Sequence, residues 1–305
     1  MNLALSVGPP RKDGLHPIAS WMVAVAFGDT LTLEEIDSPL DGAGDGLHVA
    51  FADDALQRCA VDWPLEKDLA YRAWRVMEEH VGRALPLRAR VNKRIPPGAG
   101  LGGGSSDAAT MLVGLNAWAQ LGLSREQLVE LAMQLGSDVG FLVAAMDGSP
   151  TAIVSGLGET IEPVTRDAPL HLVLMLPPFG CATGAVYRAF DEHVGAAAAL
   201  QADRVRQLAT TERVAADELF NDLAEPACVV QPELHVLRER VATLIHQPVH
   251  VTGSGAAMFA LVDDEAAAQR LAGEIRDNLD LPCIATRTLT DASIAHVLNN
   301  RPTAT

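Results

Sequence analysis

This chain of 305 residues has little positive charge, few cysteines and no long apolar run. Its 23 lysines and arginines are outnumbered by 39 aspartates and glutamates, which gives a formal net charge of −16. Nucleic-acid backbones require a basic face, so this balance argues against nonspecific nucleic-acid binding. An anionic small-molecule substrate must therefore be held by local features of the chain.

The four cysteines are scattered, and no two of them form a CxxC pair. This spacing does not make a zinc site, and a disulfide framework is not expected in a chain of this size. Apolar runs such as 21–27 are too short to span a bilayer, and the N-terminus lacks the apolar core of a signal peptide. We therefore predict a globular, cytoplasmic protein with no membrane partner. No oligomeric state and no metal ligands are predicted.

Glycine is concentrated in the segment Pro96–Ala109, which reads PPGAGLGGGSSDAA. Glycine lets the backbone approach a ligand closely and adopt positive φ angles. A helix that starts directly after such a loop points N–H donors and the positive end of its dipole at one place. This arrangement binds anions, phosphate above all, and it favours a nucleotide-using phosphotransferase.

Three other interpretations of the loop fit its residues less well. The spacing Gly98-x-Gly100-x-x-Gly103 matches a dinucleotide fingerprint, but no apolar strand precedes it and no acidic residue follows at the required distance. A Walker A loop ends in Gly-Lys-Ser/Thr, and the lysine is absent here. A flexible linker would not run directly into an Ala-rich segment with apolar residues at helical spacing from Leu112 to Trp118.

Hydrophobic periodicity and turn signals predict strands interleaved with helices, the strands mainly antiparallel. Helices are expected at 68–81, 105–121, 124–135, 184–193, 196–208, 217–227, 233–244 and 264–278, and a Ser124-x-x-Gln127 capping box opens the third. Strands are expected at 2–7, 18–27, 30–36, 48–51, 87–95, 139–145, 152–154, 171–176, 249–252, 257–262 and 283–288, with a turn at 39–46. A charged, Pro-containing stretch at 162–169 is the expected boundary between two α+β halves.

Five motifs, in order along the chain, resemble the GHMP kinase superfamily, named for galactokinase, homoserine kinase, mevalonate kinase and phosphomevalonate kinase. They are Asn2–Leu5 with Asp13–His16, the glycine loop, Leu135–Val139, Asn221–Leu223 and Val251–Ala256. The triple glycine before Ser105 is most similar to one branch, the 4-diphosphocytidyl-2-C-methyl-D-erythritol kinases of the non-mevalonate isoprenoid pathway.

The resemblance implies an α+β, two-domain GHMP kinase fold with the active site in the cleft between the domains. Residues 1–164 would form the N-terminal domain with the ATP-binding glycine loop, and 165–305 the C-terminal domain. It also implies an ATP- and Mg²⁺-dependent kinase that phosphorylates the 2-hydroxyl group of a cytidine diphosphate-linked alcohol. Two alternatives stay open: another small-molecule GHMP kinase, and a nucleotide-binding homologue with impaired catalysis.

The resemblance further assigns roles to individual residues. From the residues alone Asp138 is better interpreted as a helix-terminal cap, whereas the resemblance makes it the catalytic base. His16 and Tyr187 are expected to contact cytosine, with Tyr187 equally compatible with a helix core, and Asn2 and Thr252 are the other expected substrate contacts. The expected nucleotide contacts are Lys93, near the adenine, and Pro97, Gly98, Gly100, Leu101, Gly102, Gly103, Gly104, Ser105 and Ser106. Of the two serines, one is expected to cap the next helix and the other to contact phosphate or Mg²⁺.

Three further positions bear on these expectations. Asn221-Asp222-Leu223 is typical of the branch, and we expect it to have a structural capping role. Leu15 stands where the branch has an aromatic residue, which removes one stacking surface for the base. The branch also has a catalytic lysine two residues before the asparagine matched by Asn2, a position ahead of Met1. Either the native chain starts earlier or the protein lacks this cation.

Overall fold

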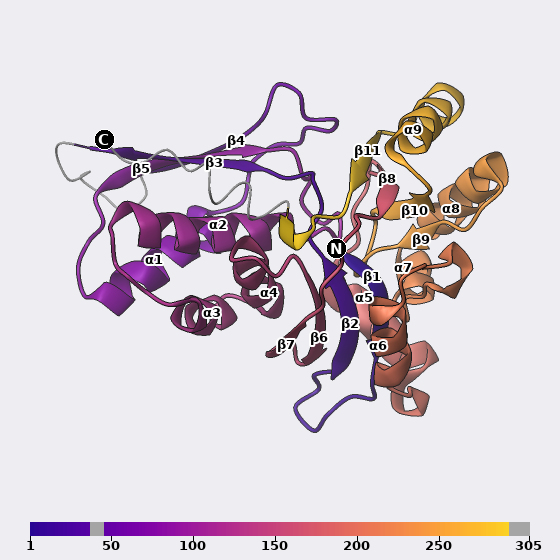
Figure 1. The fold of residues 1–305 in the computed structure, drawn as a ribbon, viewed down its shortest axis with the longest axis horizontal. Coiled ribbons are helices and arrows are strands. Elements are labelled where there is room, and N and C mark those ends of the chain that lie inside the picture. Colours follow the sequence, from indigo (N-terminus) through magenta and orange to yellow (C-terminus); the bar gives the residue numbers. More distant parts are fainter. Residues whose placement is uncertain (37–45, 293–305) are drawn as a thin grey trace. The chain divides into compact units, whose positions relative to one another are not determined.

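The computed structural model describes residues 1–36 and 46–292, and the chain divides into two compact units (Figure 1). The larger unit contains Met1–Ala26, Gly98–Leu101 and the chain from Gly148 onward, and the smaller contains Phe27–Pro97 and Gly102–Asp147. These units do not follow the order of the sequence, so they are a different division from the predicted family domains, whose boundary at 164/165 stays a prediction.

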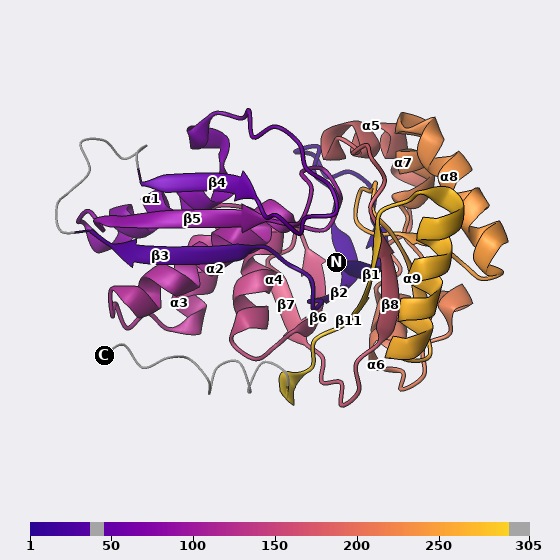
Figure 2. The same ribbon diagram turned by 90° about the horizontal axis from the view of Figure 1, so that it is seen from above.

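In the smaller unit a three-stranded sheet covers two helices (Figures 1 and 2). The strand order is β3 (Thr30–Glu35), β5 (Leu87–Lys93) and β4 (Leu47–Phe51), with β5 antiparallel to β3 and parallel to β4. Alternate residues of β5 are buried, as expected when one face of a sheet packs on helices. The helices are α1 (Leu69–Val81), α2 (Gly103–Trp118), α3 (Arg125–Met133) and α4 (Ser137–Met146), and a 3₁₀ turn, Leu65–Lys67, precedes α1.

Side-chain caps explain where two of these helices begin. Asp68 accepts the backbone N–H groups of Ala70 and Tyr71 at the start of α1. At the start of α3, the Ser124 hydroxyl accepts the N–H of Gln127, and the Gln127 side chain accepts the N–H of Ser124. The predicted capping box is therefore confirmed.

The larger unit contains two four-stranded antiparallel sheets, in the orders β1-β2-β6-β7 and β11-β8-β10-β9. The strands are β1 (Asn2–Val7), β2 (Ile18–Val23), β6 (Thr151–Gly156), β7 (Thr160–Pro163), β8 (His171–Met175), β9 (His250–Val251), β10 (Met258–Val262) and β11 (Cys283–Arg287). The helices are α5 (Thr183–His193), α6 (Ala202–Thr210), α7 (Ala224–Val230), α8 (Pro232–Ile245) and α9 (Glu265–Leu279), with 3₁₀ turns at Gly195–Ala197 and Ala216–Glu218. Helix α6 packs on the first sheet and α9 on the second.

This mixture of helices and mainly antiparallel strands confirms the predicted α+β class, but one predicted strand is wrong. Residues 139–145 lie in α4, whose apolar residues are buried on nearly every side. A short apolar run has the same pattern in a buried strand and in a buried helix, so periodicity did not distinguish them. Helix α2 also starts two residues earlier than predicted. Of the predicted turn at 39–46, only Gly46 is among the described residues.

None of the helices in the described part of the chain is both long and apolar enough to cross a bilayer.

Replacing Ser124 by alanine removes the acceptor for the N–H of Gln127, and Ser124→Asp keeps one. We expect Ser124→Ala to lower the free energy of unfolding by about 1 kcal/mol, and Ser124→Asp to change it by less than about 0.5 kcal/mol. Urea unfolding followed by circular dichroism measures both values. Equal stability of the alanine variant and the wild type would contradict a stabilising capping box.

Candidate active site

The glycine loop leads into the first turn of α2, in the smaller unit. Gly102 is the N-cap residue, with a φ of 68° and no side chain to accept an N–H. Ser106 is the first residue whose N–H reaches back into the helix, to the carbonyl oxygen of Gly102 at 2.8 Å. The helix itself therefore provides no acceptor for the N–H groups of Gly103, Gly104 and Ser105, which together form an anion-binding turn.

Ser105 and Ser106 lie inside this first turn and not at the cap. The prediction that one of them caps the helix is wrong, because the helix already begins at Gly103 and its N-cap makes no side-chain hydrogen bond. Both serines are partly buried. The alternative, that their hydroxyls contact phosphate or Mg²⁺, stays a prediction.

Asp138 lies in the first turn of α4 and close to the same loop. A Cβ atom placed on Gly102 would be 3.9 Å from Asp138 Oδ2, so the carboxylate lies beside the N-cap of α2. Burial raises the pKa of the Asp138 carboxyl. A carboxylate with a raised pKa is a stronger base, which suits a group that accepts a proton from an alcohol.

Lys93 ends β5 and is only 4% exposed. Its ammonium group is paired with the carboxylates of Asp29 and Asp107, with 2.6 Å between Lys93 Nζ and Asp107 Oδ2. Burial raises the pKa of Asp107 to about 7, an effect that Lys93 opposes and Asp29 reinforces. The sequence reasoning missed both carboxylates. Asp107 follows Ser106 directly in the glycine motif, but neither its position nor that of Asp29 indicates a lysine partner.

In the larger unit, the first half of the glycine loop packs against the turn between β9 and β10. A Cβ atom on Gly100 would lie 2.6 Å from the carbonyl oxygen of Thr252 and 2.7 Å from that of Gly255. Gly100 also has a φ of +74°, which side chains rarely allow. The Ala257 N–H donates to the carbonyl oxygen of Ala99 at 2.8 Å, so the two turns are joined backbone to backbone.

The remaining loop residues are divided between the two units. Pro97 belongs to the smaller unit, whereas Gly98 and Leu101 belong to the larger. The backbone of Gly98 is close to that of Gly180, where a Cβ atom would lie 3.0 Å from the Gly98 carbonyl oxygen. Leu101 is partly buried.

Asn2 and Thr252 are brought together in the larger unit by two hydrogen bonds. The Thr252 hydroxyl accepts the Asn2 N–H at 2.9 Å and donates to the Asn2 carbonyl oxygen at 3.2 Å. The Asn2 side-chain amide donates to the hydroxyl of Ser20 at 2.7 Å. Thr252 is fully buried, at 0% exposure, so its hydroxyl holds the backbone of β1.

Asn221 holds the same turn from another side. Its amide donates to the carbonyl oxygens of Val251 and Gly253, each at 2.8 Å. Its side-chain oxygen accepts the N–H of Leu223, the residue before α7, at 2.9 Å. Helix α7 has no side-chain cap at its N-cap residue, Leu223, so the expected capping role is not confirmed. The structural role of Asn221 lies in holding the turn after β9 and the chain that leads into α7.

His16 and Tyr187 also lie together, with 5.4 Å between their ring centroids. His16 is buried, its Nδ1 is 2.9 Å from the Gly8 carbonyl oxygen, and its Nε2 is 3.2 Å from Asp191 Oδ1. Tyr187 packs against the core of the larger unit as well as beside His16, so it shares features of both interpretations. Leu15 is 53% exposed, which shows that this apolar side chain faces solvent next to the histidine.

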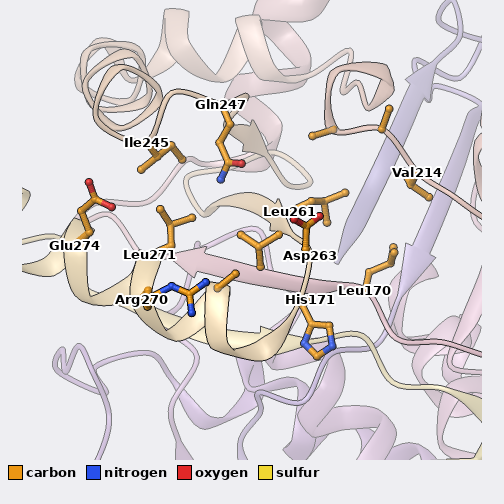
Figure 3. Close-up of a pocket in the computed structure, with 14 residues that line it drawn as sticks. Leu170, His171, Val214, Ile245, Gln247, Leu261, Asp263, Arg270, Leu271 and Glu274 are labelled. Atoms are coloured by element: carbon orange, nitrogen blue, oxygen red, sulfur yellow. The ribbon is translucent and has the colours of Figure 1, made fainter.

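A separate cavity of about 570 Å³ lies in the larger unit against β8, β10 and α9 (Figure 3). Apolar side chains such as Leu261 and Leu271 line it, together with exposed Arg270 and Asp263. None of the residues predicted from the sequence to form the site lines this cavity. It is therefore distinct from the residues around the glycine loop.

Comparison with known proteins first defines the class. Residues 68–155 match the GHMP kinases N terminal domain. The crystal structure of L. major mevalonate kinase superposes with a TM-score of 0.63 over 95% of each chain, and at 14% identity this likeness shows the fold alone. The chain therefore has the GHMP kinase fold.

More similar relatives define the family. A solved 4-(cytidine 5'-diphospho)-2C-methyl-D-erythritol kinase matches with a TM-score of 0.72 and 31% identity, over 94% of this chain and 96% of its own. The 4-diphosphocytidyl-2-C-methyl-D-erythritol kinases of Symbiobacterium thermophilum and Pseudarthrobacter chlorophenolicus are 36% and 34% identical to it. Each match covers 90% of this chain, and 93% and 86% of the respective relatives. The chain belongs to the 4-diphosphocytidyl-2-C-methyl-D-erythritol kinase family.

Gly100→Ala tests the close packing of the two turns. The added methyl group would clash with two backbone oxygens, at a φ that strains any side chain. Because backbone atoms cannot rotate away as a flexible side chain does, we expect a loss of at least about 2 kcal/mol in the free energy of unfolding. Gly273→Ala is the matched control, because Gly273 lies inside α9 with nothing within 4 Å of its Cβ position. That change should stabilise by about 0.5–1 kcal/mol. Urea unfolding of both variants measures the difference, and a Gly100→Ala variant as stable as the wild type would contradict the packing.

Asp107 should make stability depend on pH. Its pKa is about 7 in the folded chain against 3.8 for the free side chain. At a pH between these two values, the carboxyl is protonated in the folded chain and ionised in the unfolded chain. The resulting stabilisation is present below pH 4 and is lost as the pH rises to 7 and above. Relative to Asp107→Asn, the wild type should lose on the order of 1 kcal/mol or more between pH 5 and pH 8. Urea unfolding at both pH values tests this, and parallel pH dependence of the two proteins would contradict it.

Proposed function

We propose that this protein transfers the γ-phosphoryl group of ATP to the 2-hydroxyl group of 4-diphosphocytidyl-2-C-methyl-D-erythritol, a step in the non-mevalonate synthesis of isoprenoid precursors. The observation that carries this proposal is the 34–36% identity to kinases of that name along 90% of the chain. The geometry around α2 supports it, since phosphoryl transfer depends on holding phosphates in place and stabilising their charge.

The first turn of α2 supplies the phosphate site in this proposal. The N–H groups of Gly103, Gly104 and Ser105 bind phosphate oxygens, and Gly102 has no side chain to obstruct them. Among residues 1–36 and 46–292, no cluster of three His, Cys, Asp or Glu side chains is arranged to hold a metal ion. Protein-bound Mg²⁺ usually keeps several waters and binds substrate phosphates with one or two side chains, so the hydroxyls of Ser105 and Ser106 fit this requirement. When bound, Mg²⁺ neutralises charge on the transferring phosphoryl group.

Asp138 is the proposed catalytic base. Its carboxylate lies beside the N-cap of α2 and accepts the proton of the 2-hydroxyl group as that oxygen attacks the γ-phosphorus. The 2-hydroxyl is tertiary and hindered, so holding it in line with the phosphoryl group contributes as much as removing its proton. Because burial raises the pKa of Asp138, the rate should increase with pH until this carboxyl is fully ionised.

Residues of the larger unit are assigned to the cytidine portion of the substrate. His16 and Tyr187, whose rings lie side by side, are the proposed contacts for the base, and Leu15 adds an exposed apolar side chain in place of a stacking ring. Asn2 is the proposed contact at the start of β1. Thr252 acts through Asn2, because its buried hydroxyl is used in holding the Asn2 backbone.

Asp138→Asn keeps the size of the side chain but removes the base. We expect its turnover number to fall on the order of 10²-fold or more, with an unchanged circular dichroism spectrum. The measurement is release of ADP with ATP, Mg²⁺ and 4-diphosphocytidyl-2-C-methyl-D-erythritol. Asp147→Asn is the matched control, because Asp147 is exposed at the other end of the same helix, and its turnover should stay within about twofold of the wild type.

The assay is run on this chain and on a version with a lysine added immediately before Met1. Activity in either form supports the proposed reaction and provides the background for Asp138→Asn. A nearly unchanged rate in the asparagine variant would remove Asp138 from the role of base. Absence of turnover in both forms, with nucleotide still bound, would instead support the alternative of a binding homologue with impaired catalysis.

A further inference from the structure

Lys93 connects three elements of the smaller unit at the point where the phosphate site begins. It is the last residue of β5, and its ammonium group is paired with Asp29, directly before β3, and with Asp107, in the second turn of α2. Asp29 also accepts the backbone N–H groups of Arg94 and Ile95, which follow β5. One lysine and two carboxylates therefore join the end of β5 to the start of α2.

The joined segments are in direct contact at the first residue of α2. A Cβ atom on Gly103 would lie 2.7 Å from Ile95 Cγ2 and 3.5 Å from Lys93 Nζ. The position of Gly103 is thus set by the residues that Asp29 and Lys93 hold. A shift of this contact would move the N–H groups of the following turn, since a helix start is fixed by its first residues.

The burial of this cluster limits what Lys93 does. An ammonium group has three N–H donors, and the two carboxylates engage it at a site where Lys93 is 4% exposed. The summed charge of the three groups is −1 when both carboxylates are ionised and zero when one is protonated. The cluster therefore does not attract a polyphosphate by its net charge, and its contribution is geometric. Removing one member would leave a buried charge without its partner, which is strongly destabilising locally.

We propose that Lys93 is a positioning residue for the phosphate loop: through Asp29 and Asp107 it fixes the first turn of α2, and it does not act by contacting the adenine. This inference rests on the proposed function, because it concerns the turn that binds the phosphates of the nucleotide. It differs from the role that the family resemblance implies for Lys93, and the two roles make opposite predictions for a ligand that has no base.

Inorganic tripolyphosphate is that ligand. Binding of ATP and of tripolyphosphate, each with Mg²⁺, is measured by isothermal titration calorimetry for the wild type, Lys93→Met, Lys93→Arg and Lys67→Met. We expect Lys93→Met to weaken both ligands by the same factor, at least about tenfold. Lys93→Arg, which can still bridge two carboxylates, should recover most of the affinity. Lys67→Met removes an exposed lysine of the same unit and should leave both affinities within about twofold. Weaker ATP binding with unchanged tripolyphosphate binding would overturn the proposal.

A second variant separates positioning from general destabilisation. Asp107→Leu breaks the link to α2 but leaves the pair between Lys93 and Asp29. It should therefore weaken the binding of tripolyphosphate and raise KM for ATP. KM for the cytidine-linked substrate should stay within about twofold of the wild type. Ser124→Ala is the comparison, because it destabilises the same unit without touching the loop and should leave both ligand affinities unchanged. Equal losses in Ser124→Ala, or unchanged tripolyphosphate binding in Asp107→Leu, would overturn the positioning role. A wild-type chain that binds neither ligand would refute the proposed function itself, and this inference with it.

Discussion

The first turn of α2 presents backbone N–H groups that the helix itself leaves without acceptors, and the organisation of the site depends on holding that turn in place. Gly102 leaves it uncovered because a glycine N-cap has no side chain to satisfy those donors. Asp138, at the start of α4, places a carboxylate beside the same residue. The proposed phosphate-binding turn and the proposed base thus lie at two helix starts of one compact unit, and each helix is positioned by apolar packing in the shared core.

In the proposed positioning role of Lys93, the turn is held by buried charge. Removing three charged side chains from water, those of Lys93, Asp29 and Asp107, costs free energy. This cost is offset because each charge has a partner and because backbone N–H groups after β5 donate further hydrogen bonds to Asp29. The pKa of Asp107 is raised mainly by burial and, to a smaller extent, by the neighbouring Asp29 carboxylate, while Lys93 opposes the shift. The smaller unit therefore gives up some stability at neutral pH where this buried cluster joins β5 to α2.

In the larger unit, neutral groups hold the glycine-rich turns in place. Its two glycine-rich turns pack backbone against backbone, and Thr252 and Asn221 use their side chains to hold the surrounding strands. Thr252 carries a hydroxyl in a glycine-rich motif, which is why the resemblance suggested a substrate contact. In the structure that hydroxyl is buried and hydrogen-bonded to the backbone of Asn2.

The sequence by itself determined the α+β class, most element positions, the Ser124 capping box and a helix that starts at the glycine loop, because these follow from local periodicity and from residue types next to one another. It did not distinguish a strand from a helix at 139–145, since an apolar run buried on all sides has no period to read. Only the tertiary structure decided that Lys93 is neutralised by Asp29 and Asp107, 64 and 14 residues away in the chain, and that Thr252 is bonded to Asn2, 250 residues away. The reason is physical: a hydrogen bond between distant residues depends on how the strands and helices pack, and a single side chain carries no local signal of which partner that packing will bring to it.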